Sequence, residues 1–137
     1  AKGITVKEAT VSTVNDIQQA ARSLAGDVQA VYVPTDNVLA SAIPTLISVT
    51  EEAKLPVICA EGGMVRAGGL ATLGVDYYKL GFQTGVMAAD ILSGKAKPAD
   101  MAIQAQKEFK PTINLKEAAK IGLTVPEDLL KGADVIK

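Results

Sequence analysis

The chain has 137 residues, the size of one domain, and its 48% of apolar residues is enough to bury a sizeable core. A formal net charge of −1 leaves no basic surface for nucleic acid or for an anionic membrane. The sequence has no His and a single Cys, Cys59, so it lacks the commonest metal ligand, the commonest general base and an internal disulfide. Composition therefore excludes most catalytic classes and argues against a metal site.

The first residues read as the end of one element and the start of another. Residue 1 is not Met, Gly3 is a typical helix stop, and the β-branched residues of 4–11 predict a strand. The same order of helix, Gly and β-branched run recurs at 119–125. We therefore expect residue 1 to lie inside a βαβ unit, although a boundary chosen for expression would give the same start. No apolar run is long enough to span a bilayer.

Between residues 12 and 60 the pattern alternates helix and strand. A helix is predicted from Ser12 or Thr13 to Leu24, and a buried strand at 28–33. A second helix is predicted at 37–54, where Pro44 must kink or restart it. A further buried strand follows at 55–60. Alternation of this kind predicts an α/β fold built on a doubly wound parallel sheet.

The pattern weakens after residue 60. The glycines of 62–69 predict a loop or hinge. Tyr78, Phe82 and Val86 share one face of a predicted helix, which favours packing of that face. The other predicted elements are a short strand at 71–75, the helix from its cap Asp76 to about Ser93, a weakly alternating segment at 101–115, a short helix to Lys120, and a capping box of Thr124 with Glu127 before a final turn.

Polar residues follow two of the predicted strands. Asp36 and Asn37 come after the strand at 28–33, and Glu61 and Gly62 come after the strand at 55–60. Ligands bind at the carboxyl ends of strands in open parallel sheets, so Asp36 and Glu61 are expected on one rim. Two carboxylates there suit an ammonium or a hydroxyl-rich ligand. The alternative, which the residues leave open, is that Asp36 and Asn37 cap a helix and Glu61 is solvated.

The remaining motifs favour structural roles. The glycine pairs lack the Lys-Ser/Thr ending of a phosphate-binding loop and the spacing of a dinucleotide fingerprint, so no cofactor is expected. Cys59 lies in an apolar strand, where a free thiol is usually an inert core group. Tyr77, beside the helix cap Asp76, could reach the crevice.

Eight segments in order along nearly the whole chain resemble the ABC-transporter substrate-binding family that includes tryptophan and tyrosine uptake proteins. They are YVPTDN at 32–37, AKLPV at 53–57, EGGMV at 61–65, LGVDYYKLG at 73–81, ILSG at 91–94, INLK at 113–116, AK at 119–120 and GLTVP at 122–126. Each is weak alone, and together they are specific. Pro44 and Ala60 depart from the pattern.

The resemblance implies a type I periplasmic-binding-protein fold, in which two doubly wound lobes clamp a ligand between them. A complete member is about twice this length, so the chain resembles a C-terminal half. By this resemblance, residues 1–60 belong to the second lobe, 61–100 cross to the first lobe, and 101–137 return. The resemblance further implies an ABC permease as partner and an extracytoplasmic location. We expect ligand contacts from Asp36, Asn37, Glu61, Gly62, Asp76 and Tyr77.

The resemblance therefore implies a non-catalytic solute-binding component of an ABC importer, and the family favours an amino acid as ligand, with sugars, peptides and other small molecules left open. Two alternatives remain open: an α/β enzyme that uses Asp36 and Glu61 as acid and base, and the ligand-sensing domain of a transcription regulator. No nucleophile or cofactor fingerprint accompanies the two carboxylates. An uncovered sheet edge would also favour a homo-oligomer of this chain.

Overall fold

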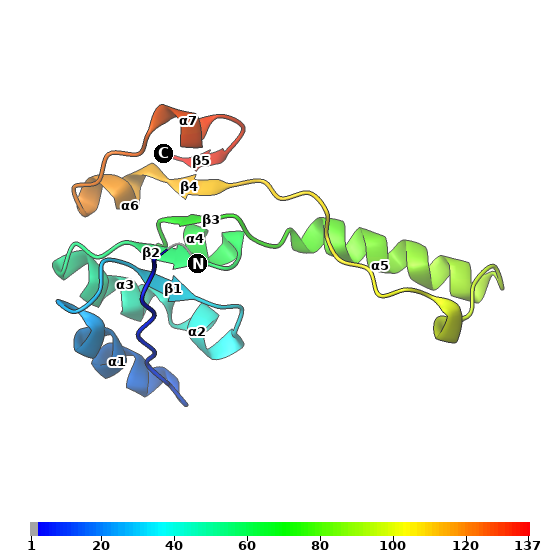
Figure 1. Ribbon diagram of the computed structural model, residues 1–137, viewed down its shortest axis with the longest axis horizontal. Coiled ribbons are helices and arrows are strands. Elements are labelled where there is room, and N and C mark those ends of the chain that lie inside the picture. The colour runs from blue at the N-terminus through cyan, green and yellow to red at the C-terminus, as the bar shows by residue number, and fades with distance from the viewer. Residues whose placement is uncertain (1–2) are drawn as a thin grey trace.

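The computed structural model describes residues 3–137, so the helix end expected at Ala1 and Lys2 lies outside the described residues. Five strands form one sheet in sequence order (Figure 1). They are β1 (Val31–Val33), β2 (Val57–Cys59), β3 (Ala71–Thr72), β4 (Thr112–Asn114) and β5 (Asp134–Ile136). The pairs β1–β2, β2–β3 and β4–β5 are parallel, and β3–β4 is antiparallel. The α/β prediction with a mainly parallel sheet is confirmed.

The helices connect these strands. They are the 3₁₀ turn η1 (Val14–Asp16), α1 (Ile17–Leu24), α2 (Asn37–Ser41), α3 (Ile43–Glu52), α4 (Gly62–Arg66), α5 (Tyr77–Leu92), the 3₁₀ turn η2 (Pro98–Asp100), α6 (Leu115–Lys120) and α7 (Glu127–Leu130). The predicted break at Pro44 is confirmed, because α2 ends at Ser41 and Pro44 lies in the first turn of α3. Proline is tolerated there since the first-turn amides have no partner within the helix.

The core lies on both sides of β2, because alternate residues of a strand face opposite sides of the sheet. Val57 and Cys59 join the larger cluster, to which α1, β1, α3 and α4 also contribute. Ile58 faces the smaller cluster, formed with Leu70, Ala118 and Ile121. On β1 the middle residue, Tyr32, is 65% exposed while Val31 and Val33 are buried. The sheet is therefore well covered on one face and only partly covered on the other.

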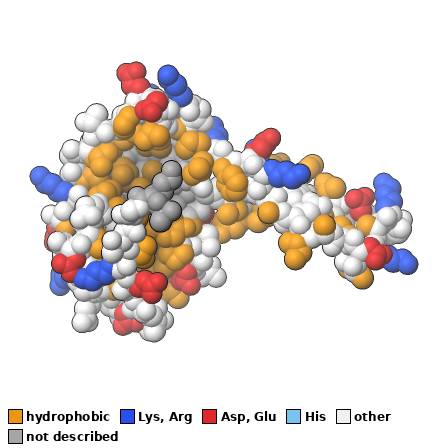
Figure 2. All heavy atoms as spheres, viewed as in Figure 1, with side chains coloured by type: hydrophobic (Ala, Val, Ile, Leu, Met, Phe, Trp, Pro, Cys, Tyr) orange, Lys and Arg blue, Asp and Glu red, His pale blue; other side chains and the backbone are white. Residues whose placement is uncertain are grey.

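One segment leaves this body. Helix α5 and the chain that returns along it to β4 extend away from the sheet as an arm, residues 73–111 (Figure 1). No residue of α5 is buried, and apolar side chains are visible along the arm in Figure 2. The face expected to pack is exposed, with Tyr78 at 84% and Phe82 at 69%. None of the described helices is both long and apolar enough to cross a membrane.

Two local predictions near the ends of the chain are wrong. Residues 4–11 form no strand, because no neighbouring strand in the described structure takes up their backbone groups; Ile4 and Val6 are 80% and 76% exposed. The capping box of Thr124 with Glu127 is absent, because α7 begins only after Pro126 and has no side-chain cap. Strand β5 had no predicted counterpart.

The predicted loop at 62–69 is also wrong in its first half. Residues Gly62–Arg66 form helix α4, because the carboxylate of Glu61 caps the first turn and so compensates for two glycines. Helix α4 and strand β3 both pack with β2, so this part of the chain still lies against the sheet. The lobe boundary expected at residue 61 stays a prediction.

Candidate functional site

Three carboxylates cap helices at one edge of the sheet. Asp36 caps α2 after β1, Glu61 caps α4 after β2, and Asp76 caps α5 after β3. The backbone brings these turns together: the Ala60 amide donates to the Val33 carbonyl at 2.9 Å, and Glu61 pairs with Val75 in a parallel bridge. The acids expected on one rim are therefore neighbours.

Glu61 is held by two backbone amides. Its Oε2 accepts from the Gly63 N–H at 2.7 Å, and its Oε1 accepts from the Met64 N–H at 2.7 Å. A Cβ on Gly63 would lie 2.9 Å from Oε2, so any larger residue there would displace the folded carboxylate. Each carboxylate oxygen has a second lone pair, so Glu61 can still accept a hydrogen bond from a ligand.

Asp36 and Asp76 are held in the same way. The Asp36 Oδ1 accepts from the Leu39 N–H at 2.9 Å, and the Asp76 Oδ1 accepts from the amides of Tyr78 and Lys79 at 3.0 and 3.1 Å. The capping alternative for Asp36 is thus realised in the structure. It does not exclude ligand binding, because caps of this kind fix the orientation of a carboxylate and leave acceptor capacity.

Two hollows open beside these caps. The larger has a volume of about 630 Å³ and is lined by Thr35, Asp36, Asn37, Ala40, Glu61, Met64 and Tyr77. The smaller, about 290 Å³, includes Glu61, Gly62, Asp76 and Tyr77 in its lining. Glu61 and Tyr77 belong to both hollows. The six residues expected from the sequence to contact ligand therefore all line these two hollows.

The smaller hollow also contains charged residues that the sequence analysis missed. Arg66 donates to the Asp134 carboxylate at 2.6 Å, and Lys79 pairs with Glu108 at 3.2 Å. Lys110 also lines the hollow. Arg66 and Asp134 are 68 residues apart, and no local spacing connects them. These charged residues meet at the site only because the chain returns to the sheet at β4 and β5.

The thiol beneath the site is unreactive. Burial, with the nearby negative charge of Glu61, raises the pKa of Cys59 to about 12. The thiol is therefore protonated at physiological pH and is not a nucleophile. Within residues 3–137, no three His, Cys, Asp or Glu side chains form a cluster that could hold a metal ion.

Comparison with known proteins gives a consistent family. The family model described as ABC transporter substrate binding protein matches residues 1–137. The tyrosine-binding protein of Clostridioides difficile is 37% identical over 132 residues, which cover 96% of this chain and 34% of that protein. An uncharacterized protein of Rickettsia prowazekii is 29% identical over 126 residues, 92% of this chain and 41% of its own length.

Solved structures of this kind superpose closely. A conserved domain protein from Vibrio cholerae has a TM-score of 0.88 at 37% identity, and the ABC domain in complex with L-Trp from Streptococcus pneumoniae has 0.87 at 37%. Both comparisons cover 98% of this chain and 45% of the other. A ligand-free, open substrate binding protein from Clostridium difficile has a TM-score of 0.76 at 35% identity. The chain thus spans less than half the length of these relatives.

Proposed function

The chain belongs to the ABC transporter substrate-binding protein family, and from this premise we propose that it forms one wall of an amino-acid binding site in a solute-binding protein. The observation that carries the proposal is the convergence of the Asp36, Glu61 and Asp76 caps on two hollows that share Glu61 and Tyr77. The relatives agree with it: one is named for tyrosine binding, and one was solved with L-Trp.

The ligand's ammonium group binds between Asp36 and Glu61. Both carboxylates line the larger hollow, and their backbone hydrogen bonds hold them in place before a ligand arrives. A preorganised acceptor loses little side-chain freedom on binding, and an ammonium–carboxylate hydrogen bond is roughly twice as strong as a neutral one. Glu61 is the main partner because it lines both hollows.

The ligand's side chain lies against Tyr77. This ring is 58% exposed and lines both hollows at the start of α5. Aromatic pairs stack or meet edge to face with ring centres about 4.5–7 Å apart, and such a pair stabilises a complex beyond the area that it buries. An aromatic amino acid therefore fits this wall better than an aliphatic one.

The rest of the binding protein follows from the family. The lobe built on the five-stranded sheet supplies the wall described here, the arm crosses to the first lobe, and a ligand is clamped between the two. An ABC permease receives the ligand, and the protein acts outside the cytoplasm. The enzyme alternative gains no support from the comparisons, because the family that matches is one of substrate-binding proteins.

An NMR titration of this chain tests the proposal. A single wall buries only part of a ligand, so affinity for L-tryptophan or L-tyrosine is expected in the millimolar range. The amides of Leu39, Met64 and Tyr78, which donate to the three caps, should shift most. N-acetyl-L-tryptophan, which has no ammonium group, is the matched ligand control. Shifts confined to other regions, or equal shifts with both ligands, would contradict the proposal.

A further inference from the structure

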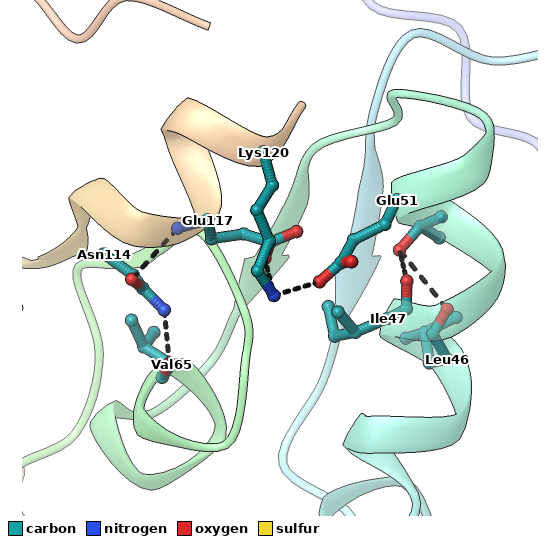
Figure 3. Close-up of polar contacts among 8 residues, drawn as sticks. Leu46, Ile47, Glu51, Val65, Asn114, Glu117 and Lys120 are labelled. Atoms are coloured by element: carbon teal, nitrogen blue, oxygen red, sulfur yellow. Dashed lines mark hydrogen bonds and ion pairs between the residues drawn. The ribbon is translucent and has the colours of Figure 1, made fainter. Parts of the chain in front are cut away.

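A buried carboxyl group faces a second carboxyl group away from the binding rim. Glu117 on α6 is 2% exposed, and it lies opposite Glu51 of α3 with Lys120 beside both (Figure 3). The Lys120 Nζ is 2.6 Å from the Glu51 Oε1 and 3.7 Å from the Glu117 Oε2. None of these three residues lines either hollow. This cluster therefore needs an explanation separate from ligand binding.

The cluster joins two parts of the chain that are separated by the arm. Helix α3 precedes the arm, and α6 directly follows β4, where the chain returns. The other polar tether of α6 is Asn114, whose Oδ1 accepts from the Glu117 N–H at 3.1 Å and whose Nδ2 donates to the Val65 carbonyl at 3.3 Å (Figure 3). Asn114 carries no charge, so the contact to α3 is the part of this attachment that responds to pH.

The charges around Glu117 are few. Glu51 faces it from α3 and Lys120 from its own helix. Arg66 of α4 is engaged elsewhere, with the Gly62 carbonyl and the Asp134 carboxylate of β5. Glu52 at the end of α3 and Lys54 just after it are exposed, and among the described residues Lys54 makes no ion pair with Glu117. One ammonium therefore faces two carboxyl groups, one of which is buried.

When Glu117 is protonated, the cluster holds one negative charge, on Glu51, and one positive charge, on Lys120. The neutral Glu117 carboxyl can donate a hydrogen bond to the Glu51 carboxylate, which in turn binds the Lys120 ammonium. The ionised form would leave a second negative charge in a buried position, beside Glu51. We propose that Glu51, Glu117 and Lys120 form a pH-sensitive clasp that holds α6 against α3 most firmly when Glu117 carries a proton. The inference holds whether or not the hollows bind an amino acid.

The pKa shifts in the cluster define the pH range. Burial, then the hydrogen bond to Glu51 and its negative charge, raises the pKa of Glu117 from 4.5 to about 6. The native state binds this proton more tightly than the unfolded chain, so the stabilising effect is present at low pH and is lost as pH rises through about 6. The hydrogen bond with Lys120 lowers the pKa of Glu51, so its own titration lies below this range.

The clasp also connects to the site. Strand β4 runs directly into α6 and places Thr112 in the lining of the smaller hollow. A change in how firmly α6 is seated is therefore transmitted to the strand that forms one wall. The arm returns to the lobe at this strand as well.

A carboxyl-detected NMR titration of the wild-type chain tests the proposal directly. The Glu117 side chain, assigned by its absence in Glu117→Gln, is expected to titrate near the pKa of about 6. In Glu51→Gln the midpoint should fall, because the negative neighbour is gone. A midpoint near the ordinary value for Glu would overturn the proposal. A raised midpoint that Glu51→Gln leaves unchanged would also overturn it, because burial alone would then explain the shift.

Thermal unfolding provides the second readout. The melting temperature of Glu117→Gln relative to wild type should rise by about 2–4 °C between about pH 5 and about pH 7.5, since only the wild type loses the proton. The control is Glu52→Gln, which removes an exposed carboxylate from α3, next to Glu51. Its difference from wild type should not change with pH over this range. A constant difference for Glu117→Gln would overturn the proposal.

Discussion

Helices α3 and α5 show how similar patterns lead to different environments. Both are rich in apolar residues, yet α3 buries Ile43, Leu46, Ile47, Val49 and Thr50, whereas α5 buries none of its residues. Helix α3 packs against α1 and shares a core cluster with β1 and β2, whereas α5 extends along the arm (Figure 1). Apolar spacing therefore predicts that a segment is helical, and the surrounding chain decides whether its apolar face is covered.

The same contrast holds for function. The lobe fixes carboxylates through caps at the ends of its strands, which gives the site a rigid rim. The base of the arm contributes Asp76, Tyr77 and Lys79 to the smaller hollow. The apolar side chains farther along α5, such as Phe82 at 69% exposure, lie outside both hollows. The lobe thus carries stability and preorganisation, and the arm carries surface that packing in this chain does not use.

Truncating one large side chain in each region should give the largest difference in the free energy of unfolding. Ile43 is fully buried, so Ile43→Ala should lower the free energy of unfolding by about 2–5 kcal/mol. Phe82→Ala removes an exposed ring and should change it by no more than about 0.5 kcal/mol. Urea denaturation of both variants measures this, and equal losses would contradict the division into lobe and arm.

Substitutions of Gly74 and Gly81 test the same difference in packing. At Gly74, where the arm meets the sheet, a Cβ would lie 2.1 Å from the Ala60 carbonyl oxygen, so Gly74→Ala should destabilise the protein by about 2–4 kcal/mol. A Cβ on Gly81 of α5 would meet nothing within 4 Å. Gly81→Ala should therefore stabilise helix α5 by about 0.5–1 kcal/mol. Unfolding followed by circular dichroism measures the change in stability for each variant. A destabilising effect of Gly81→Ala would contradict the exposed position of Gly81 on α5.

The third comparison concerns a local effect at the junction of the two regions. Asp76→Ala removes the cap of α5 and should destabilise its first turn by about 1 kcal/mol, whereas Asp76→Asn should largely preserve it. Hydrogen exchange of the amides of Tyr78 and Lys79, which donate to Asp76, reports this locally. If exchange there is unchanged in Asp76→Ala, the cap does not stabilise the start of the arm.

Local chemistry made much of the site predictable. Pro44 restarts a helix and Asp76 caps one within a few residues of sequence, and both predictions are confirmed. Asp36 and Glu61 were expected on one rim because they follow adjacent parallel strands, and both line the larger hollow. Their role as ligand contacts stays a prediction.

The rest depends on contacts between distant residues. The pairs Arg66–Asp134 and Glu51–Lys120 join residues 68 and 69 positions apart, which no spacing rule connects. The β-branched residues of 4–11 predicted a strand, but a strand also needs a partner, and the described structure offers none. Helix α4 was missed because two glycines outweighed the cap at Glu61. In each case the tertiary neighbour decides the outcome.

The central claim is that Glu61 receives the ammonium group of an amino acid, and one double comparison tests it. Affinities of wild type and Glu61→Gln are measured by NMR for L-tryptophan and for N-acetyl-L-tryptophan. The account predicts that Glu61→Gln weakens binding of L-tryptophan about tenfold or more and leaves that of the acetylated ligand nearly unchanged. An equal effect on both ligands, with the fold intact by circular dichroism, would contradict the claim.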